Sequence, residues 1–137
     1  MAAYTKYQKT VEDIHLKKHN FAGDTLKILL SNTAPNVATD NAQADAVEIA
    51  SGNGYTLGGE TVGIASASQT GGLFSLVPSA DVVFTASGGS VGPFRYAILW
   101  NSTADLLVSY WDRGSSLTLL DAEVFTVDVQ ATLFTAS

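Results

Sequence analysis

The stretch Phe94-Arg-Tyr-Ala-Ile-Leu-Trp100 shows the clearest alternation of apolar residues in the chain, with large apolar side chains at every second position. A second stripe with the same period follows at Leu106, Val108 and Tyr110. Side chains of a β-strand point to opposite faces in turn, so a period of two predicts a strand with one buried face. These two stripes therefore predict two consecutive β-strands.

Shorter stretches of the same kind occur on both sides of this pair, and glycine pairs or turn clusters separate most of them. They include residues 26–30, a weaker stretch at 62–66, residues 73–77 and 82–84, residues 125–129 and a last strand near Leu133. About seven to nine strands at intervals of roughly ten residues predict an all-β fold, an antiparallel β-sandwich or jelly roll.

Length and composition agree with this class of fold. A chain of 137 residues is of the size of one domain. It contains no cysteine, which excludes disulfides and thiolate metal sites. Only 15% of its residues are charged, against about 25% in a typical domain. This composition indicates either a β-protein with many turns or a surface that contacts other proteins.

Charge is distributed unevenly along the chain. Residues 1–27 carry five lysines against three carboxylates, whereas residues 28–137 carry two arginines against ten carboxylates. The basic segment is interpreted as either a solvated segment or an arm that lies on an acidic neighbour, such as another copy of the chain. Nucleic acid is not expected as a partner, because the acidic part would repel phosphate.

The N-terminal segment has a pattern of its own. Tyr4, Tyr7, Val11 and Ile14 are spaced three and four residues apart, as on one face of a helix. We expect residues 1–22 to form an arm or short helix that serves assembly, followed by a β-sandwich domain over residues 23–137. Such a segment would be mobile when free and would bury these four side chains when docked.

Histidines and serines provide two weak signals for chemistry. His15 and His19 have the spacing of helical metal ligands, but Lys17 and Lys18 between them would repel a cation. Ser90 stands in a Gly-x-Ser-x-Gly sequence, but a strand is predicted after it where a hydrolase requires a helix. We interpret that segment as a turn.

Carboxylates provide two further weak signals for chemistry. Asp121 and Glu123 could form a pair on one face of a strand, and residues 40–45 contain several oxygen ligands. We interpret these acids as turn caps and solvated strand faces rather than as a catalytic pair or a calcium site. No catalytic residue, cofactor or metal site is predicted.

Trp111 is an aromatic residue for which the sequence allows three different roles. It has the opposite parity from Tyr110, so it points outward if Tyr110 points inward. An outward tryptophan beside Arg113 could stack on a sugar ring or dock into a partner subunit. Alternatively, both faces near this strand end are covered. We predict Trp111 and Arg113, with the four N-terminal residues above, as protein-contact residues.

Several stretches, taken in order, resemble a family of small virion proteins of tailed bacteriophages. These stretches are Asp24–Pro35, Glu48–Thr56, Phe84–Thr103 and Tyr110–Ser116, and the likeness extends over nearly all of the chain from about Val11. The ordered set carries the resemblance, since no single motif is diagnostic.

The resemblance implies a non-enzymatic structural protein of a phage particle. A capsid decoration or cement protein is expected, with the major capsid protein and copies of itself, in a dimer or trimer, as partners. The alternative is a tail or fibre component that binds a glycan or receptor. The family provides no catalytic residues to carry over, and a hydrolase is the third interpretation.

The expected location is the virion, after synthesis in the host cytoplasm. The polar N-terminus lacks the apolar core of a signal peptide, and no apolar run is long enough to span a bilayer, so no membrane association is expected.

Overall fold

The computed structural model describes residues 3–129 and 133–136 of the chain. The described residues form ten β-strands, one α-helix and one short 3₁₀ turn, which confirms an all-β fold with a short helix. In chain order these elements are β1 (Ala3–Lys6), α1 (Gln8–His15), β2 (Leu26–Ser31), the turn η1 (Gln43–Asp45), β3 (Glu60–Val62), β4 (Ile64–Thr70), β5 (Leu73–Pro78), β6 (Val82–Thr85), β7 (Val91–Asn101), β8 (Leu106–Leu119), β9 (Val124–Val127) and β10 (Phe134–Ala136).

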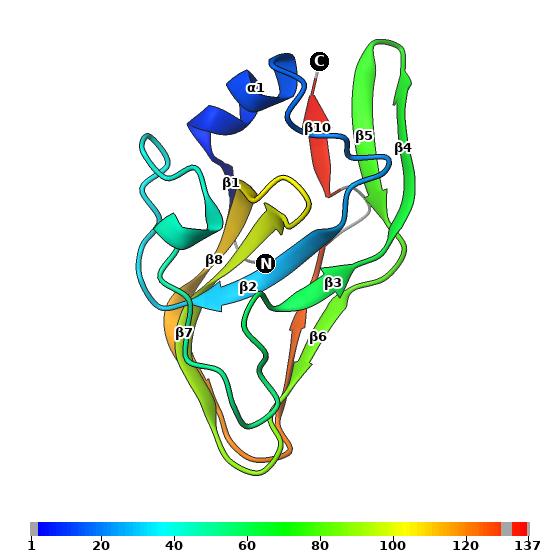
Figure 1. The fold of residues 1–137 in the computed structure, drawn as a ribbon. Helices are drawn as coiled ribbons and strands as arrows, with labels where there is room; N and C mark the ends of the chain where they lie inside the picture. The colour runs from blue at the N-terminus through cyan, green and yellow to red at the C-terminus, as the bar shows by residue number, and fades with distance from the viewer. Residues whose placement is uncertain (1–2, 130–132, 137) are drawn as a thin grey trace.

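The strands form three antiparallel sheets. The largest has the order β1-β8-β7-β2-β3, the second has the order β10-β5-β4, and β6 pairs with β9 in a two-stranded ribbon. Figure 1 shows the long β7–β8 hairpin on one side of the molecule, with β6 across from it and the β4–β5 hairpin standing at one end. The arrangement is sandwich-like, because the main core lies between the large sheet and the two smaller ones.

Large apolar side chains from all three sheets fill the main core. The alternation at Leu26, Ile28 and Leu30 directs one face of β2 into it, and these three side chains are fully buried. From the other strands the core receives Val62, Leu76, Val82, Phe84, Phe94, Ala97, Leu99, Val108, Trp111, Leu119, Val127 and Phe134. Burial on this scale is the dominant favourable contribution to folding.

The opposite face of the central strands is buried as well. Leu29, Tyr96, Ile98 and Leu107 form a second cluster there with Tyr7. Ala46 of the connection between β2 and β3 packs against this cluster, and Pro35 lines a small pocket there with Tyr7 and Ile98. Strands β2 and β7 are therefore covered on both faces, which explains why their sequences contain nearly continuous apolar runs.

Local irregularities break the predicted stripe on β7. The pairing of β7 with β8 shifts between Phe94 and Tyr96, so Phe94 enters the main core while Tyr96, Ile98 and Trp100 belong to the second cluster. The prediction that all four share one face is wrong, because a bulge reverses the parity of the strand.

The sequence Gly114-Ser115-Ser116 is a turn cluster of the kind that is expected to separate two strands, but it does not end a strand here. Strand β8 continues through these residues to Leu119, and Gly114 has a φ of 92°. Glycine adopts this conformation without a steric penalty, so it bends the strand without ending it.

Tyr55 connects the long segment between β2 and β3 to the centre of the large sheet. Its hydroxyl accepts a hydrogen bond from the backbone N–H of Leu30 (3.1 Å) and donates one to the carboxylate of Glu48. The same carboxylate accepts the backbone N–H of Gly58 at 2.6 Å. The ring is 3% exposed, and this burial is the largest cause of a raised hydroxyl pKa. One buried hydroxyl thus holds the connection in place.

We expect Tyr55→Phe to lower the free energy of unfolding by about 2 kcal/mol, because it leaves a buried N–H of β2 without its side-chain partner. Urea denaturation measures this loss as a shift in midpoint at constant m-value. Glu48→Gln, which keeps an acceptor at the same position, should cost less. A change below about 0.5 kcal/mol for Tyr55→Phe would show that the hydroxyl does not hold the segment.

Candidate interaction site

A pocket of about 220 Å³ opens between β9 and the β7–β8 hairpin, and we call it the β8–β9 pocket. Apolar side chains form most of its wall, and charged ones stand among them. The lining residues are Arg95, Ala97, Trp111, Arg113, Phe125, Thr126, Val127 and Asp128. Residues 28–137 contain only two cationic side chains, Arg95 and Arg113, and both line this pocket. The positive charge of the acidic part of the chain is therefore concentrated at one place.

Arg95 is held there by Asp112 of the neighbouring strand. Its Nε donates to one carboxylate oxygen at 2.7 Å and its Nη2 to the other at 3.1 Å, a bidentate geometry. The hydrogen bond from Arg95 lowers the pKa of Asp112, and the backbone N–H of Gly114 contributes in the same direction. The pair fixes the direction of the Arg95 side chain while leaving it accessible at the surface.

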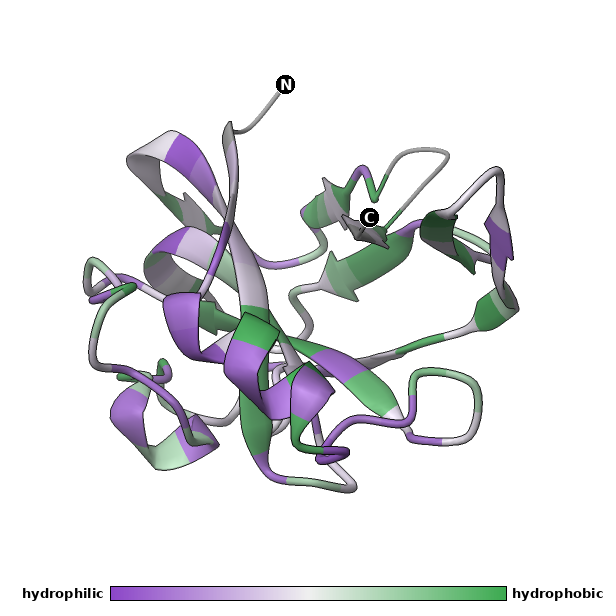
Figure 2. Cartoon of the chain, turned by 90° about the horizontal axis from the view of Figure 1, so that it is seen from above, coloured by the Kyte–Doolittle hydropathy of each residue, from purple (hydrophilic) through white to green (hydrophobic). Residues whose placement is uncertain are grey.

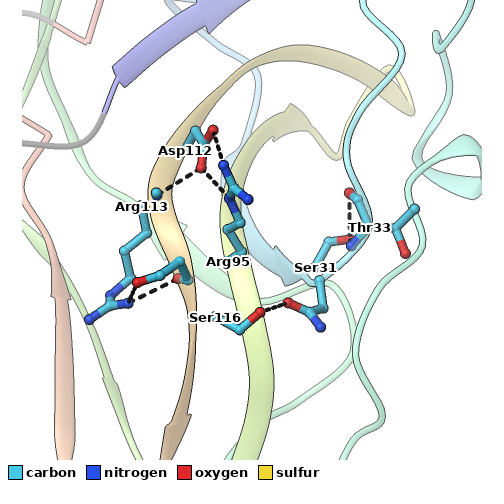
Figure 3. A network of polar contacts seen from close by, with 9 residues as sticks. Ser31, Thr33, Arg95, Asp112, Arg113 and Ser116 are labelled. Carbon is cyan, nitrogen blue, oxygen red and sulfur yellow. Dashed lines mark hydrogen bonds and ion pairs between the residues drawn. The ribbon is translucent and has the colours of Figure 1, made fainter.

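Arg113 points away from this ion pair, as Figure 3 shows. Its Nη1 donates to the backbone oxygen of Ser115 at 2.9 Å and to the Ser115 hydroxyl at 3.1 Å. The bulged backbone around Gly114 brings these acceptors within reach. Arg113 is exposed beside the pocket, as a contact residue must be.

Trp111 does not point outward, which was one of the positions that strand parity allowed. It lies on the opposite face from Tyr110, as predicted, but it is Trp111 that enters the main core, with 4% of its surface exposed. Tyr110 packs on the other side against Tyr7 and Tyr96. The small residue Ala97 is paired with Trp111 and leaves space for the indole on the inner face. An outward, sugar-stacking Trp111 is therefore wrong.

The four N-terminal contact residues are not brought together on one face. Tyr7 is 1% exposed in the second cluster, and Ile14 is half-buried beside the main core. Tyr4 and Val11 keep 39% and 52% of their surface exposed. The four side chains do not form one apolar face because β1 ends before Tyr7 and the helix begins after it. Their burial on a partner stays a prediction.

The described part of the N-terminal segment is integrated into the fold. Strand β1 pairs with β8 over four residues, and the Lys6 ammonium reaches the backbone oxygen of Thr135 at 3.2 Å. Residues 1, 2, 130–132 and 137, which belong to the predicted arm and domain, lie outside the described residues. In this structure the segment from Ala3 onward is an edge strand and a packed helix rather than a free arm.

The two fully buried side chains of α1 are polar, and Ile14 is only half-buried against the main core. The Thr10 hydroxyl donates to the backbone oxygen of Val108 at 2.8 Å, and Asp13 accepts a hydrogen bond from Asn41 at 2.8 Å. Both side chains are completely buried. Figure 2 views the molecule from the helix end and shows that α1 mixes hydrophilic and hydrophobic residues. An apolar stripe could not reveal this anchor, because the residues that bind the sheet are polar.

His19 belongs to a polar cluster rather than to a metal site. Helix α1 ends at His15, so the two histidines do not share a helical face. The Oδ1 of the buried Asn101 accepts the backbone N–H groups of Thr103 and Ala104, which fixes its amide orientation. Its Nδ2 therefore donates to Nδ1 of His19 at 3.1 Å, an arrangement that requires a neutral imidazole.

This geometry predicts that stability falls as the pH drops below about 6.5. Burial is the largest cause of the lowered pKa of His19, so between its folded and unfolded pKa values the unfolded chain binds more protons. Stability from this group is present above the unfolded pKa and lost as the pH falls toward the folded one. Urea midpoints between pH 7 and 5 should decline less in His19→Gln than in the wild type. His15→Gln is the control, and equal slopes in all three proteins would contradict the prediction.

The predicted acids act as turn caps. Asp121 accepts the backbone N–H of Gly88 at 2.9 Å, and Glu123 accepts that of Leu120 at 2.7 Å. Asp45 accepts two backbone N–H groups, which lower its pKa. A strand follows Ser90, as predicted from the sequence. Among the described residues there is no cluster of three or more His, Asp or Glu side chains that could hold a metal ion.

The outer face of the β6–β9 ribbon carries no charge. Val83 lies opposite Thr126, and Thr85 lies opposite Val124. All four side chains are exposed, whereas their neighbours on the inner face enter the core. Charged side chains on edge strands prevent association with other strands or proteins, and this face has none. Sequence alternation predicted these strands but gave no reason to select their outer face.

No helix in the described part of the chain is long and apolar enough to cross a bilayer. Comparison with protein-family models, curated proteins and solved structures finds no match to this chain.

Proposed function

We propose that the chain is a non-enzymatic structural protein of a bacteriophage virion. In this proposal it is a capsid decoration protein that bridges subunits of the major capsid protein and associates with copies of itself. The resemblance over residues from about Val11 onward suggests the particle. The structural observation that carries the proposal is the exposed, uncharged outer face of the β6–β9 ribbon.

This face suits a protein that binds an assembled shell. Val83 and Val124 are about half exposed, so burying them on a partner removes apolar surface from water at little conformational cost. The ribbon is held from below by Val82, Phe84 and Val127, which are buried in the core. A protein that binds only the assembled shell stabilises it by mass action, and repeated copies allow each contact to be modest.

The proposal is tested by the copy number in purified virions and by rebinding. Decoration predicts on the order of hundreds of copies per particle, because a shell repeats its binding sites many times and repeated contacts act together. Val83→Lys should weaken rebinding to particles stripped of this protein by about tenfold, because a charge would be buried at the contact. Ser87→Lys, in an exposed loop after the ribbon, is the matched control.

Absence from virions, or equal rebinding of Val83→Lys and the control, would overturn the proposal. A copy number of a few to a few dozen would instead support the alternative of a tail or fibre component. The tail or fibre alternative relied on an exposed Trp111 that would stack on a sugar ring. This indole is buried, so it cannot serve as that platform.

A further inference from the structure

The β4–β5 hairpin belongs to the longest uncharged segment of the chain. No Asp, Glu, Lys or Arg occurs between Glu60 and Asp81. The same chain carries a net charge of −6, so two copies repel one another over most of their surfaces. Contact through this hairpin avoids that repulsion.

Strand β4 is also the end strand of its sheet. It pairs with β5 on one edge, and among the described strands, in the order β10-β5-β4, it has no neighbour on the other. Six of its seven residues are small or polar and uncharged, and Ser66, Ser68 and Gln69 are exposed. Figure 1 shows β4 on the outside of the molecule, away from the large sheet. A long uncharged edge is a template for pairing with another strand.

The hairpin register identifies the backbone groups that face this open edge. Gly71 and Gly72 have φ values of 60° and 86° and form a two-residue turn between the paired residues Thr70 and Leu73. Residues that flank such a turn bond to each other, and bonded pairs then alternate along the ladder. Ser68 is therefore bonded to β5, whereas the N–H and C=O groups of Ala67 and Gln69 point away from it.

We infer that the free edge of β4 pairs antiparallel with β4 of a second copy of this chain. The result is a two-fold symmetric dimer with a continuous sheet of the order β10-β5-β4 followed by the partner's β4-β5-β10. Ala67 and Gln69 of each copy supply the new backbone hydrogen bonds. The occupant is a second copy because an antiparallel pair of identical strands satisfies both edges with one interface and brings no like charges together.

This inference rests on the self-association in the proposed function and adds the surface that mediates it. Dimerisation is tested with the purified chain alone, whereas capsid binding is tested by rebinding to stripped particles. A negative result for dimerisation therefore does not contradict capsid binding. The interface is small, so the dimer is expected to be weak and is measured at protein concentrations up to about 1 mM.

Sedimentation velocity of the full chain, with charge variants at Ser68, is the experiment. Antiparallel pairing places Ser68 of one copy opposite or diagonal to Ser68 of the other. Ser68→Lys and Ser68→Glu should therefore each weaken dimerisation by about tenfold, through like-charge repulsion. An equimolar mixture of the two variants should restore it. Ser87→Lys and Ser87→Glu, in an exposed loop elsewhere, should dimerise like the wild type.

Amide hydrogen exchange provides a readout at the residues concerned. The amides of Ala67 and Gln69 should become more protected as the concentration of the wild type rises, while that of Ser68 is protected throughout. A wild type that stays monomeric up to about 1 mM would overturn the inference. It would also be overturned by charge variants that dimerise like the wild type, or by a mixture that fails to restore association.

Discussion

Gly59→Ala is expected to lower the free energy of unfolding by about 4 kcal/mol or more, enough to prevent folding of many small domains. Gly59 lies directly against β2, and a Cβ at this position would overlap the backbone oxygen of Ile28 and come within 2.8 Å of the Cα of Leu29. Both contacts are with the backbone of β2, which lies between β7 and β3 and cannot move without breaking the ladder to β7. The φ of 80° adds the usual penalty for a side chain in the left-handed region.

Gly72→Ala is the matched control for this prediction. Gly72 has a φ of 86°, close to that of Gly59, but a Cβ there would meet no atom within 4 Å. It therefore carries only the conformational penalty, about 1 kcal/mol. Chemical denaturation of both variants separates the cost of steric overlap from the cost of backbone strain. If Gly59→Ala does not fold, soluble expression and circular dichroism of the two variants are compared instead. Similar losses in the two variants would show that Gly59 does not pack against β2 as described.

Trp111→Ala is expected to cost about 3 to 5 kcal/mol, as large-to-small changes of buried aromatic residues do. The indole fills the space between the large sheet and the smaller ones, and Tyr4 packs beside it with 5.2 Å between ring centroids. Its removal would leave a cavity continuous with the β8–β9 pocket, which Trp111 lines. The loss is therefore one of folding stability.

Trp100→Ala is the control, because the chain contains only these two tryptophans. Trp100 is half-buried on the other face, where its indole N–H donates to the backbone oxygen of Gly58 at 3.0 Å. We expect a smaller loss of about 2 kcal/mol, from one hydrogen bond and partial burial. Urea denaturation measures both variants. A loss below about 1 kcal/mol for Trp111→Ala would mean that the indole faces solvent and that the burial described is incorrect.

The contact residues predicted from the sequence differ in their exposure in the folded chain. Arg113 is exposed beside a pocket, where a contact residue is useful, but Tyr7 and Trp111 are buried within the chain. All three predictions came from spacing and residue type. Spacing states which side chains share a face, but it does not state which face is covered by another element. Tyr7 is covered by the second cluster, to which Ile98, Ala46 and Tyr110 belong, and these residues are distant from it in sequence.

Alternation of apolar residues and the positions of glycines determined the fold class and most of the strands. Both are local properties, because strand parity and left-handed turns such as Gly71-Gly72 depend on neighbouring residues alone. Only the tertiary structure decided that β2 and β7 are buried on both faces, that Phe94 departs from its stripe, and that β4 is left with an open edge. Burial and edge exposure depend on which distant segments pack together, and no local pattern contains that information.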